Sequence, residues 1–186
     1  MYNVIKWIRW ERPPIGWKKL NIDGSRLGII GRASYCGVVR NEHGRWIVGF
    51  SKHIGSASIF VAEMWGLRDG LILCSNLNIQ CLIVEVDARA LVDALLNSDY
   101  VNIVVSPLLD DCRHLLSRFQ QVQIRHCFQQ ANRYADTMAR LGSVQLLDYF
   151  VFHSPPVDIL EAFEADLNGM YFSISFFALY KRIYYE

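Results

Sequence analysis

Between residues 17 and 142 the apolar residues change their spacing in a definite order, and this order restricts the folds open to the chain. Five runs have the composition and turn boundaries of strands, and they cover residues 17–23, 34–41, 46–52, 82–86 and 122–128. Four segments have the spacing of helices, and they cover residues 61–73, 89–97, 107–119 and 132–141. The order β-β-β-α-β-α-α-β-α predicts an α/β fold, a mixed five-stranded sheet with helices on both faces.

The two flanks of this region have different patterns. Residues 1–16 contain Pro13, Pro14 and Gly16, which predict an extended lead-in. Residues 143–186 contain Pro155-Pro156 and have weaker periodicity, so we expect an appended C-terminal tail. The predicted organisation is therefore a lead-in at 1–16, one domain at 17–142 and a tail at 143–186.

The composition narrows the class of protein. With 52% hydrophobic and 20% charged residues, the chain is typical of a globular protein. No apolar run approaches the roughly 20 residues needed to span a membrane, and the first residues lack the pattern of a secretory signal, so we expect no membrane partner. The five cysteines form no C-x-x-C pair and stand among apolar residues, which favours reduced, buried thiols in an intracellular protein. Nucleus and cytoplasm both stay open, and we infer no obligate protein partner.

The formal net charge of +1 hides an uneven distribution. Residues 1–60 hold ten Lys and Arg against three Asp and Glu, whereas residues 61–120 hold four against eight. A basic N-terminal part can meet a polyanion, and an acidic remainder can hold metal ions. Charge alone fits an ordinary solvated surface equally well.

Four carboxylates stand in contexts that would each hold a side chain in one place. Asp23 and Asp87 follow apolar runs that predict strands, and Glu63 and Asp136 lie within predicted helices. Carboxylate oxygens are the ligands that Mg²⁺ prefers, and two such ions can activate water for an in-line displacement at phosphorus. Four converging carboxylates therefore predict a metal-dependent site for phosphodiester chemistry.

Each of these carboxylates also has a simpler interpretation. An Asp at a strand end is often a turn residue or a helix N-cap, and Asp87 stands two residues before a predicted helix. Glu63 and Asp136 can be ordinary solvated helix residues. The metal hypothesis rests on the four residues taken together.

Several segments, in order, resemble one family. They are Gly16-Trp17-Lys18-Lys19-Leu20-Asn21-Ile22-Asp23-Gly24-Ser25, Gly37-Val38-Val39-Arg40-Asn41-Glu42-His43-Gly44, Ala62-Glu63, Val84-Glu85-Val86-Asp87 and Ala131-Asn132-Arg133-Tyr134-Ala135-Asp136. Over roughly residues 17–142 the chain is similar to the plant type 1 ribonuclease H-like domain, many examples of which derive from non-LTR retrotransposon polyproteins.

The resemblance implies a ribonuclease H-like fold and cleavage of the RNA strand of RNA–DNA hybrids with two Mg²⁺ or Mn²⁺ ions. It implies that Asp23 bridges both metals, with Glu63 and Asp87 on one side and Asp136 on the other. Asn132 is expected to orient Asp136 or to contact the hybrid. We expect the remaining hybrid contacts from Gly24 and Ser25 and from basic residues, namely Lys18, Lys19, Arg26, Arg32, Arg40 and Lys52.

Departures from the family pattern favour a second hypothesis, a catalytically weak or inactive nucleic-acid-binding module left from a retroelement. Relatives usually carry Arg and then Glu where this chain has Gln129 and Gln130, and Ser where it has Ala88. The loop at 26–31 is apolar for a surface that faces nucleic acid. We expect His126, inside a predicted strand, to have a structural role. The chain can also be a fragment of a longer polyprotein, and it has no phosphate-binding glycine motif that would indicate a dehydrogenase or kinase.

Overall fold

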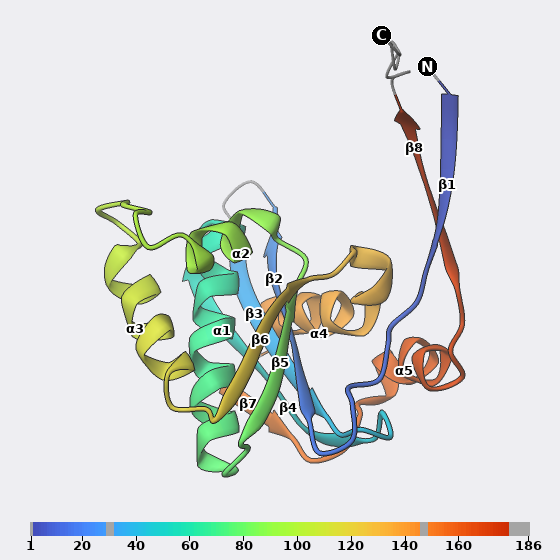
Figure 1. Ribbon diagram of the computed structural model, residues 1–186, viewed down its shortest axis with the longest axis horizontal. Helices are drawn as coiled ribbons and strands as arrows, with labels where there is room; N and C mark the ends of the chain where they lie inside the picture. Colours follow the sequence, from blue (N-terminus) through green and yellow to red (C-terminus); the bar gives the residue numbers. More distant parts are fainter. Residues whose placement is uncertain (1, 29–31, 146–148, 179–186) are drawn as a thin grey trace, which may run out of the picture.

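The computed structural model describes residues 2–28, 32–145 and 149–178 (Figure 1). The strands are β1 (Tyr2–Ile8), β2 (Lys18–Leu27), β3 (Arg32–Arg40), β4 (Trp46–Ser56), β5 (Cys81–Val86), β6 (Gln121–His126), β7 (Tyr149–Phe152) and β8 (Phe172–Ala178). The helices are α1 (Ile59–Asn76), α2 (Arg89–Leu96), α3 (Ser106–Leu116), α4 (Arg133–Val144) and α5 (Leu160–Leu167), with 3-10 turns η1 (Gln129–Ala131) and η2 (Val157–Ile159).

The predicted order of strands and helices from residue 17 to residue 142 is confirmed, and the sheet is mixed as expected. Its strand order is β6-β5-β2-β3-β4-β7, with β5 and β6 parallel to β2 and the other neighbours antiparallel. The sheet has six strands and not five, because β7 pairs with β4 from Gly49↔Phe152 to Lys52↔Tyr149. A four-residue strand is too short to show a period in sequence.

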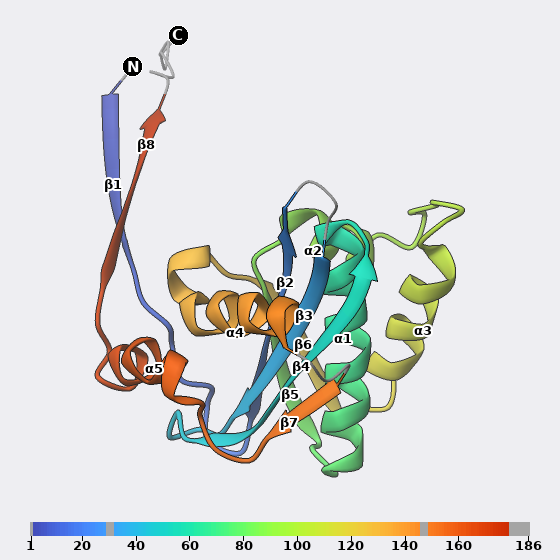
Figure 2. The same ribbon diagram turned by 180° about the vertical axis from the view of Figure 1, so that it is seen from behind.

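Helices cover both faces of this sheet (Figure 2). The helices α1, α2 and α3 pack on one face, where Leu20, Ile22 and Leu67 belong to the larger apolar core. Helix α4 covers the other face, and Val38, Tyr134 and Met138 are buried there. Side chains along β2 alternate between the two faces of the sheet. Leu20 and Ile22 point to the face covered by α1, and the residues between and beside them, Lys19, Asn21 and Asp23, point to the other face. Asp23 therefore lies on the α4 side of the central strand.

Both expected flanks contact the rest of the protein. The lead-in contains β1, which pairs antiparallel with β8 of the tail over seven residue pairs, from Tyr2↔Ala178 to Ile8↔Phe172. After β1, Trp10 is buried in the core beneath α4, and in the tail Phe163 of α5 makes edge-on ring contacts with Trp46 and Tyr134. Strands near the two ends of the chain thus meet in a two-stranded ribbon that stands clear of the main sheet (Figures 1 and 2).

Two expectations from composition can be compared with this structure. All five cysteines are free, and four of them are buried whereas Cys81 is half-buried. Among the described residues, no helix combines the length and apolar character that a membrane crossing requires.

Candidate active site

Strand pairing brings Asp23 and Asp87 to the same level. Strands β2 and β5 run parallel in register up to the pair Asn21↔Glu85, and Asp23 and Asp87 each follow two residues later. Strand β5 ends at Val86, whereas β2 continues to Leu27 because β3 still pairs with it. Asp23 therefore lies inside its strand, which corrects the expectation that the strand ends there, and the space left beyond the end of β5 is open to both carboxylates.

Helix α1 supplies the third carboxylate. Ser58 caps the helix by accepting a hydrogen bond from the backbone N–H of Val61, and Glu63 follows in the next turn. Gly24 allows the helix to approach the strand, because a Cβ at this position would lie 2.9 Å from both the backbone nitrogen and Cγ of Glu63. A glycine in β2 thus determines how near Glu63 comes to Asp23.

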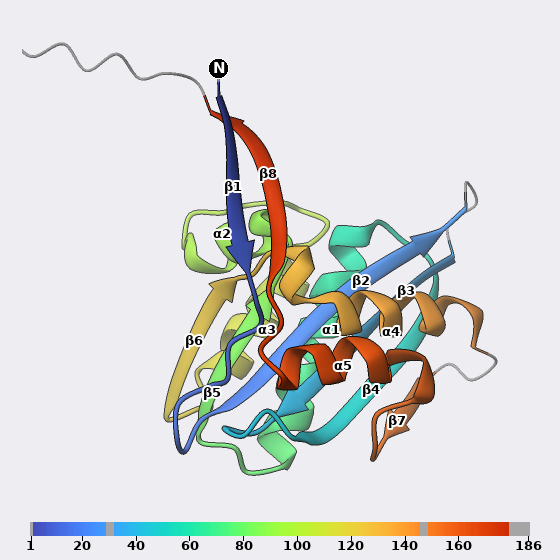
Figure 3. The same cartoon turned by 90° about the vertical axis from the view of Figure 1, so that its right-hand side faces the viewer.

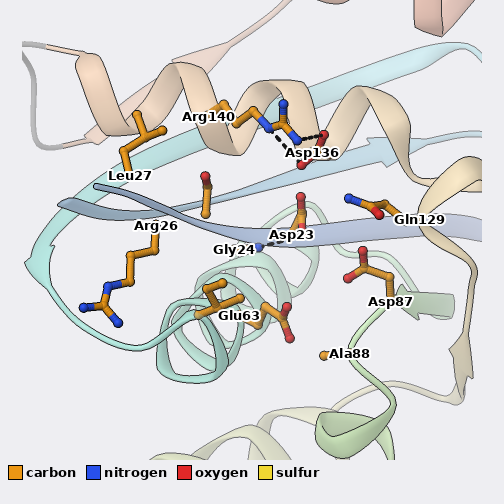
Figure 4. A pocket seen from close by; sticks show the side chains of 12 residues that line it. Asp23, Gly24, Arg26, Leu27, Glu63, Asp87, Ala88, Gln129, Asp136 and Arg140 are labelled. Atoms are coloured by element: carbon orange, nitrogen blue, oxygen red, sulfur yellow. Dashed lines mark hydrogen bonds and ion pairs between the residues drawn. The ribbon is translucent and has the colours of Figure 1, made fainter. Parts of the chain in front are cut away.

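One carboxylate oxygen from each of Asp23, Glu63 and Asp87 lies within 4.8 Å of the other two (Figure 4). Asp23 and Glu63 are each only 4% exposed. Burial, together with the charges of Asp87, Glu63 and Asp136, raises the pKa of Asp23 to about 9. Burial and the charge of Asp87 raise the pKa of Glu63 to about 8, and burial also raises the pKa of Asp87 above its ordinary value.

A divalent cation fits this group of oxygens. Oε2 of Glu63 is buried and has no hydrogen-bond partner among the described residues, which is costly for a carboxylate unless something else neutralises it. All the donor atoms are hard oxygens, as Mg²⁺ and Mn²⁺ prefer. The N-cap interpretation of Asp87 is wrong, because Ala88 occupies the N-cap position of α2 and no side chain caps the helix.

Asp136 is held differently from the other three. It projects from the first turn of α4, and Arg140, one turn later, donates to both of its oxygens, with Nε 3.1 Å from Oδ1 and Nη2 3.0 Å from Oδ2 (Figure 4). Asp136 is not among the three carboxylates whose oxygens lie within 4.8 Å of one another. The predicted quartet is therefore three converging carboxylates and a fourth that borders the same cavity with an arginine attached.

A buried polar network fixes the helix that carries Asp136. The Nδ2 of Asn132 donates to the backbone oxygen of Ile22 over 2.9 Å, and its Oδ1 accepts from Nδ2 of Asn21 over 3.2 Å. Asn132 is fully buried. It therefore ties the start of α4 to β2 and orients Asp136, and the expectation that it touches the hybrid is corrected.

The cavity in front of the carboxylates has a volume of about 560 Å³. It is lined by Asp23, Gly24, Ser25, Arg26, Leu27, Ile59, Glu63, Asp87, Ala88, Gln129, Asp136 and Arg140. Of the predicted substrate contacts, Gly24, Ser25 and Arg26 do reach this cavity. Arg32 is exposed at the start of β3, opposite Leu27 in the register.

Three of the predicted basic contacts lie elsewhere. Lys19 is 1% exposed because it forms an ion pair with Glu85 and donates to the backbone oxygen of Glu11. Arg40 is fully buried and pairs with Asp166 over 3.1 Å. Lys18 pairs with Glu42 at the opposite end of β2 from the carboxylates. Sequence position alone does not distinguish a surface cation from one that neutralises a buried carboxylate.

Two further residues of the predicted site region can be placed. His126 ends β6, where its ring packs edge-on against Phe128. Lys52 lies in the second half of β4, and its side chain is 36% exposed. Its Nζ lies 4.0 Å from Oδ2 of Asp69. Of the apolar loop, Leu27 lines the cavity, whereas Ile29 and Ile30 lie outside the described residues. Arg140 was not predicted, although its spacing of four from Asp136 is the spacing of a helical ion pair.

Known proteins resemble the chain in the region that contains this site. A family model described as reverse transcriptase-like matches residues 21–142, which is about two thirds of the chain and includes all four carboxylates. The chain belongs to the reverse transcriptase-like family. A protein of Arabidopsis thaliana with the name "Putative ribonuclease H protein" is 34% identical over 166 residues, covering 89% of this chain and 27% of that protein. The chain thus spans about a quarter of its curated relative.

Solved structures agree with the family match. The N-terminal ribonuclease H domain of a Mycobacterium tuberculosis protein has a TM-score of 0.64 at 25% identity, with 68% of this chain and 93% of that chain covered. Ribonuclease H1 from Halobacterium salinarum has a TM-score of 0.63 at 21% identity, with 68% and 96% covered. A ribonuclease H1 named LC11, solved with an RNA/DNA hybrid, has a TM-score of 0.61 at 18% identity, with 67% and 94% covered. The predicted resemblance to a plant ribonuclease H-like domain is confirmed, and so is the fold class.

Proposed function

We propose that this ribonuclease H-like domain hydrolyses the RNA strand of RNA–DNA hybrids in a reaction that depends on Mg²⁺ or Mn²⁺. The observation that carries the proposal is the convergence of Asp23, Glu63 and Asp87 within 4.8 Å at the end of β5, around a buried carboxylate oxygen that has no partner among the described residues. A bound divalent cation would offset the repulsion between these three carboxylates, which supports the proposal.

Each residue has a role in this proposal. Asp23, Glu63 and Asp87 would hold one metal ion, and Asp136 would supply a ligand to a second ion from the α4 side of the cavity. Bound divalent ions supply the activation of water and the neutralisation of phosphate charge that in-line displacement requires. Gly24 and Ser25 border the carboxylates, where backbone groups can approach a phosphodiester, and Arg26 adds positive charge at the rim.

A second function, a nucleic-acid-binding module with little or no turnover, is favoured by three residues of the cavity lining. Arg140 occupies both oxygens of Asp136, so that this carboxylate is committed to an ion pair on its own helix. Gln129 lines the cavity as a neutral residue, and Ala88 offers no hydroxyl there. A protein that binds hybrids through the same surface would need none of the four carboxylates.

Cleavage of a labelled RNA–DNA hybrid by the purified chain, with Mg²⁺ or Mn²⁺, tests the two functions. The matched control is the double variant Asp23→Asn/Asp87→Asn, which removes two ligand charges with little change in volume. Metal-dependent cutting of the RNA strand that the double variant lacks is the expected result. A folded protein that binds the hybrid but does not cut it with either metal would establish the binding module instead.

A further inference from the structure

The β1–β8 ribbon is a part of the molecule that the carboxylate site does not use. It lies outside the residues that the family model matches, and from a base beside α4 and α5 it extends in the direction in which β2 and β5 run (Figure 1 and Figure 3). A two-stranded ribbon buries little surface by itself and is marginally stable in isolation. Contacts at its base must therefore hold it in place.

Cations resting on aromatic rings make these contacts. Nζ of Lys6, in β1, lies 4.6 Å from the centre of the Phe128 ring. The guanidinium of Arg133, at the start of α4, lies 4.6 Å from the centre of the Phe172 ring in β8. Arg9, directly after β1, lies 4.8 Å from the ring centre of Tyr171. Three positive charges are thereby held in fixed positions around the base of the ribbon.

The face of the ribbon that points away from Lys6 carries Ile5 and Trp7 and has no charged residue. Trp7 is 64% exposed and Ile5 is 59% exposed, and their register partners on β8 are Ser173 and Ser175. The sequences of β1 and β8 contain no acidic residue. Below the ribbon, Glu11 and Glu85 border a smaller groove together with Arg9 and Arg125, and Glu85 is already neutralised by Lys19.

This surface continues into the carboxylate cavity. Phe128, which is 36% exposed under Lys6, directly precedes Gln129, a residue of the cavity lining. Arg133 precedes Asp136 by one helical turn on α4. We define the ribbon surface as Lys6, Arg9, Phe128 and Arg133. Trp7 is not part of it, because consecutive side chains of β1 point to opposite faces of the ribbon.

We propose that the ribbon surface binds the backbone of a nucleic-acid strand that extends out of the carboxylate cavity. The inference rests on the proposed function, because it places the same hybrid on a second part of the protein. Fixed cations neutralise phosphates and release counterions, which favours a strand backbone as the occupant. A second copy of this chain is a poorer occupant, since a lysine on a free strand edge opposes strand pairing and two basic ribbons repel each other.

The test is the affinity of the Asp23→Asn protein for a labelled RNA–DNA hybrid in EDTA, measured by fluorescence anisotropy over a range of salt concentrations. This background binds without cutting, so binding is read separately from cleavage. Lys6→Glu and Arg133→Glu are each expected to weaken binding at least about threefold and to lower the salt slope by about 1. Arg118→Glu, an equal charge change at an exposed residue after α3, is the control and is expected to leave both values unchanged.

The outcomes separate this proposal from the proposed function. Weaker binding by the Lys6 and Arg133 variants supports the ribbon surface even if the parent protein does not cut the hybrid. Unchanged affinity and salt slope in folded Lys6→Glu and Arg133→Glu proteins would overturn it even if cleavage is robust. A dimer in sedimentation equilibrium that Trp7→Ala dissociates would also overturn it, because the ribbon would then be a contact between copies.

Discussion

Asp23 has the most strongly raised pKa of the carboxylates at this site. Burial on the central strand raises this pKa, and so do the charges of the three other carboxylates. The folded, metal-free protein therefore keeps protons that the unfolded chain releases near pH 4. Metal binding would exchange those protons for a cation.

We predict that the metal-free protein loses stability as the pH rises. The pKa values of Asp23 and Glu63 are raised to about 9 and about 8, so between about pH 4 and these values the folded state binds more protons than the unfolded state. The free energy of unfolding must then fall across this window. Urea denaturation in EDTA from pH 5 to pH 9 measures it.

Controls for the pH series are available in the same chain. Asp23→Asn should flatten the pH dependence, whereas Asp99→Asn, at an exposed carboxylate, should not. Mg²⁺ should stabilise the unsubstituted protein more at pH 8 than at pH 6, because protons compete with the metal. A stability that rises between pH 5 and pH 9 without metal would show that these carboxyls are not protonated in the folded protein.

Arg140 gives a second prediction for single residues. Replacing it by Gln removes a positive charge from the cavity and releases Asp136, so Mn²⁺ should bind more tightly, by up to about fivefold, the equivalent of the ~1 kcal/mol that an exposed ion pair contributes at most. Isothermal titration of Mn²⁺ measures the change, with Arg118→Gln as the control. Weaker binding in Arg140→Gln would mean that the arginine supports the metal-binding form of Asp136.

Among the secondary-structure elements, the approach of α1 to β2 matters most for the site. A Cβ on Gly24 would lie 2.9 Å from the backbone nitrogen of Glu63 and 3.0 Å from the backbone oxygen of Ile59. Backbone atoms can yield only if the first turns of the helix move. Gly24 is thus a determinant of the distance between a strand carboxylate and a helix carboxylate.

Gly24→Ala is expected to destabilise the protein by about 1–3 kcal/mol and to weaken Mn²⁺ binding at least about tenfold, since overpacking displaces α1 and with it Glu63. The matched variant is Gly37→Ala, whose Cβ would lie 2.4 Å from the ring of Phe50 on β4, and neither residue lines the cavity. It should lower stability without changing Mn²⁺ affinity. Thermal melts measure the stability of both variants, and titrations measure their Mn²⁺ affinity. Equal losses of Mn²⁺ affinity in the two variants would contradict a specific role for Gly24.

Sequence reasoning succeeded where the signal is local and failed where it is not. The strand and helix patterns around Asp23, Glu63 and Asp87 are each readable within about ten residues, and so the three carboxylates could be predicted to converge. The pairing of β1 with β8 joins residues near opposite ends of the chain, and no local sequence pattern indicates it. Lys19 could have been placed inside, because on a strand it shares a face with Asn21 and Asp23 and alternates with Leu20.

At the scale of the whole molecule, Arg40 links three parts of the chain. Its guanidinium lies 3.3 Å from the ring centre of Trp10 in the lead-in and 4.2 Å from that of Tyr134 in α4, and it pairs with Asp166 of α5. Nε and Nη1 of Arg40 are buried without a hydrogen-bond partner among the described residues. The carboxylate of Asp166 is therefore the principal compensation for this buried charge.

We predict that Asp166→Ala destabilises the protein by about 3–5 kcal/mol, the usual cost of leaving one partner of a buried ion pair uncompensated. Glu164→Ala, at an exposed position on the same helix, should change stability by less than about 0.5 kcal/mol. Urea denaturation of the two variants gives the comparison. A small loss in Asp166→Ala would show that ring contacts alone accommodate the charge of Arg40.

The positions of Lys19 and Arg40 also affect how this domain should be isolated. Both cations are buried, and in the sequence Arg40 lies within residues 21–142, which the family model matches, whereas Lys19 lies just before them. Their partners include the backbone oxygen of Glu11 and the carboxylate of Asp166, and both of these residues lie outside 21–142. A recombinant chain trimmed to the family boundaries would keep all four carboxylates and lose these partners. Its failure to cut a hybrid would then report misfolding, and an assay of catalysis needs both flanks in place.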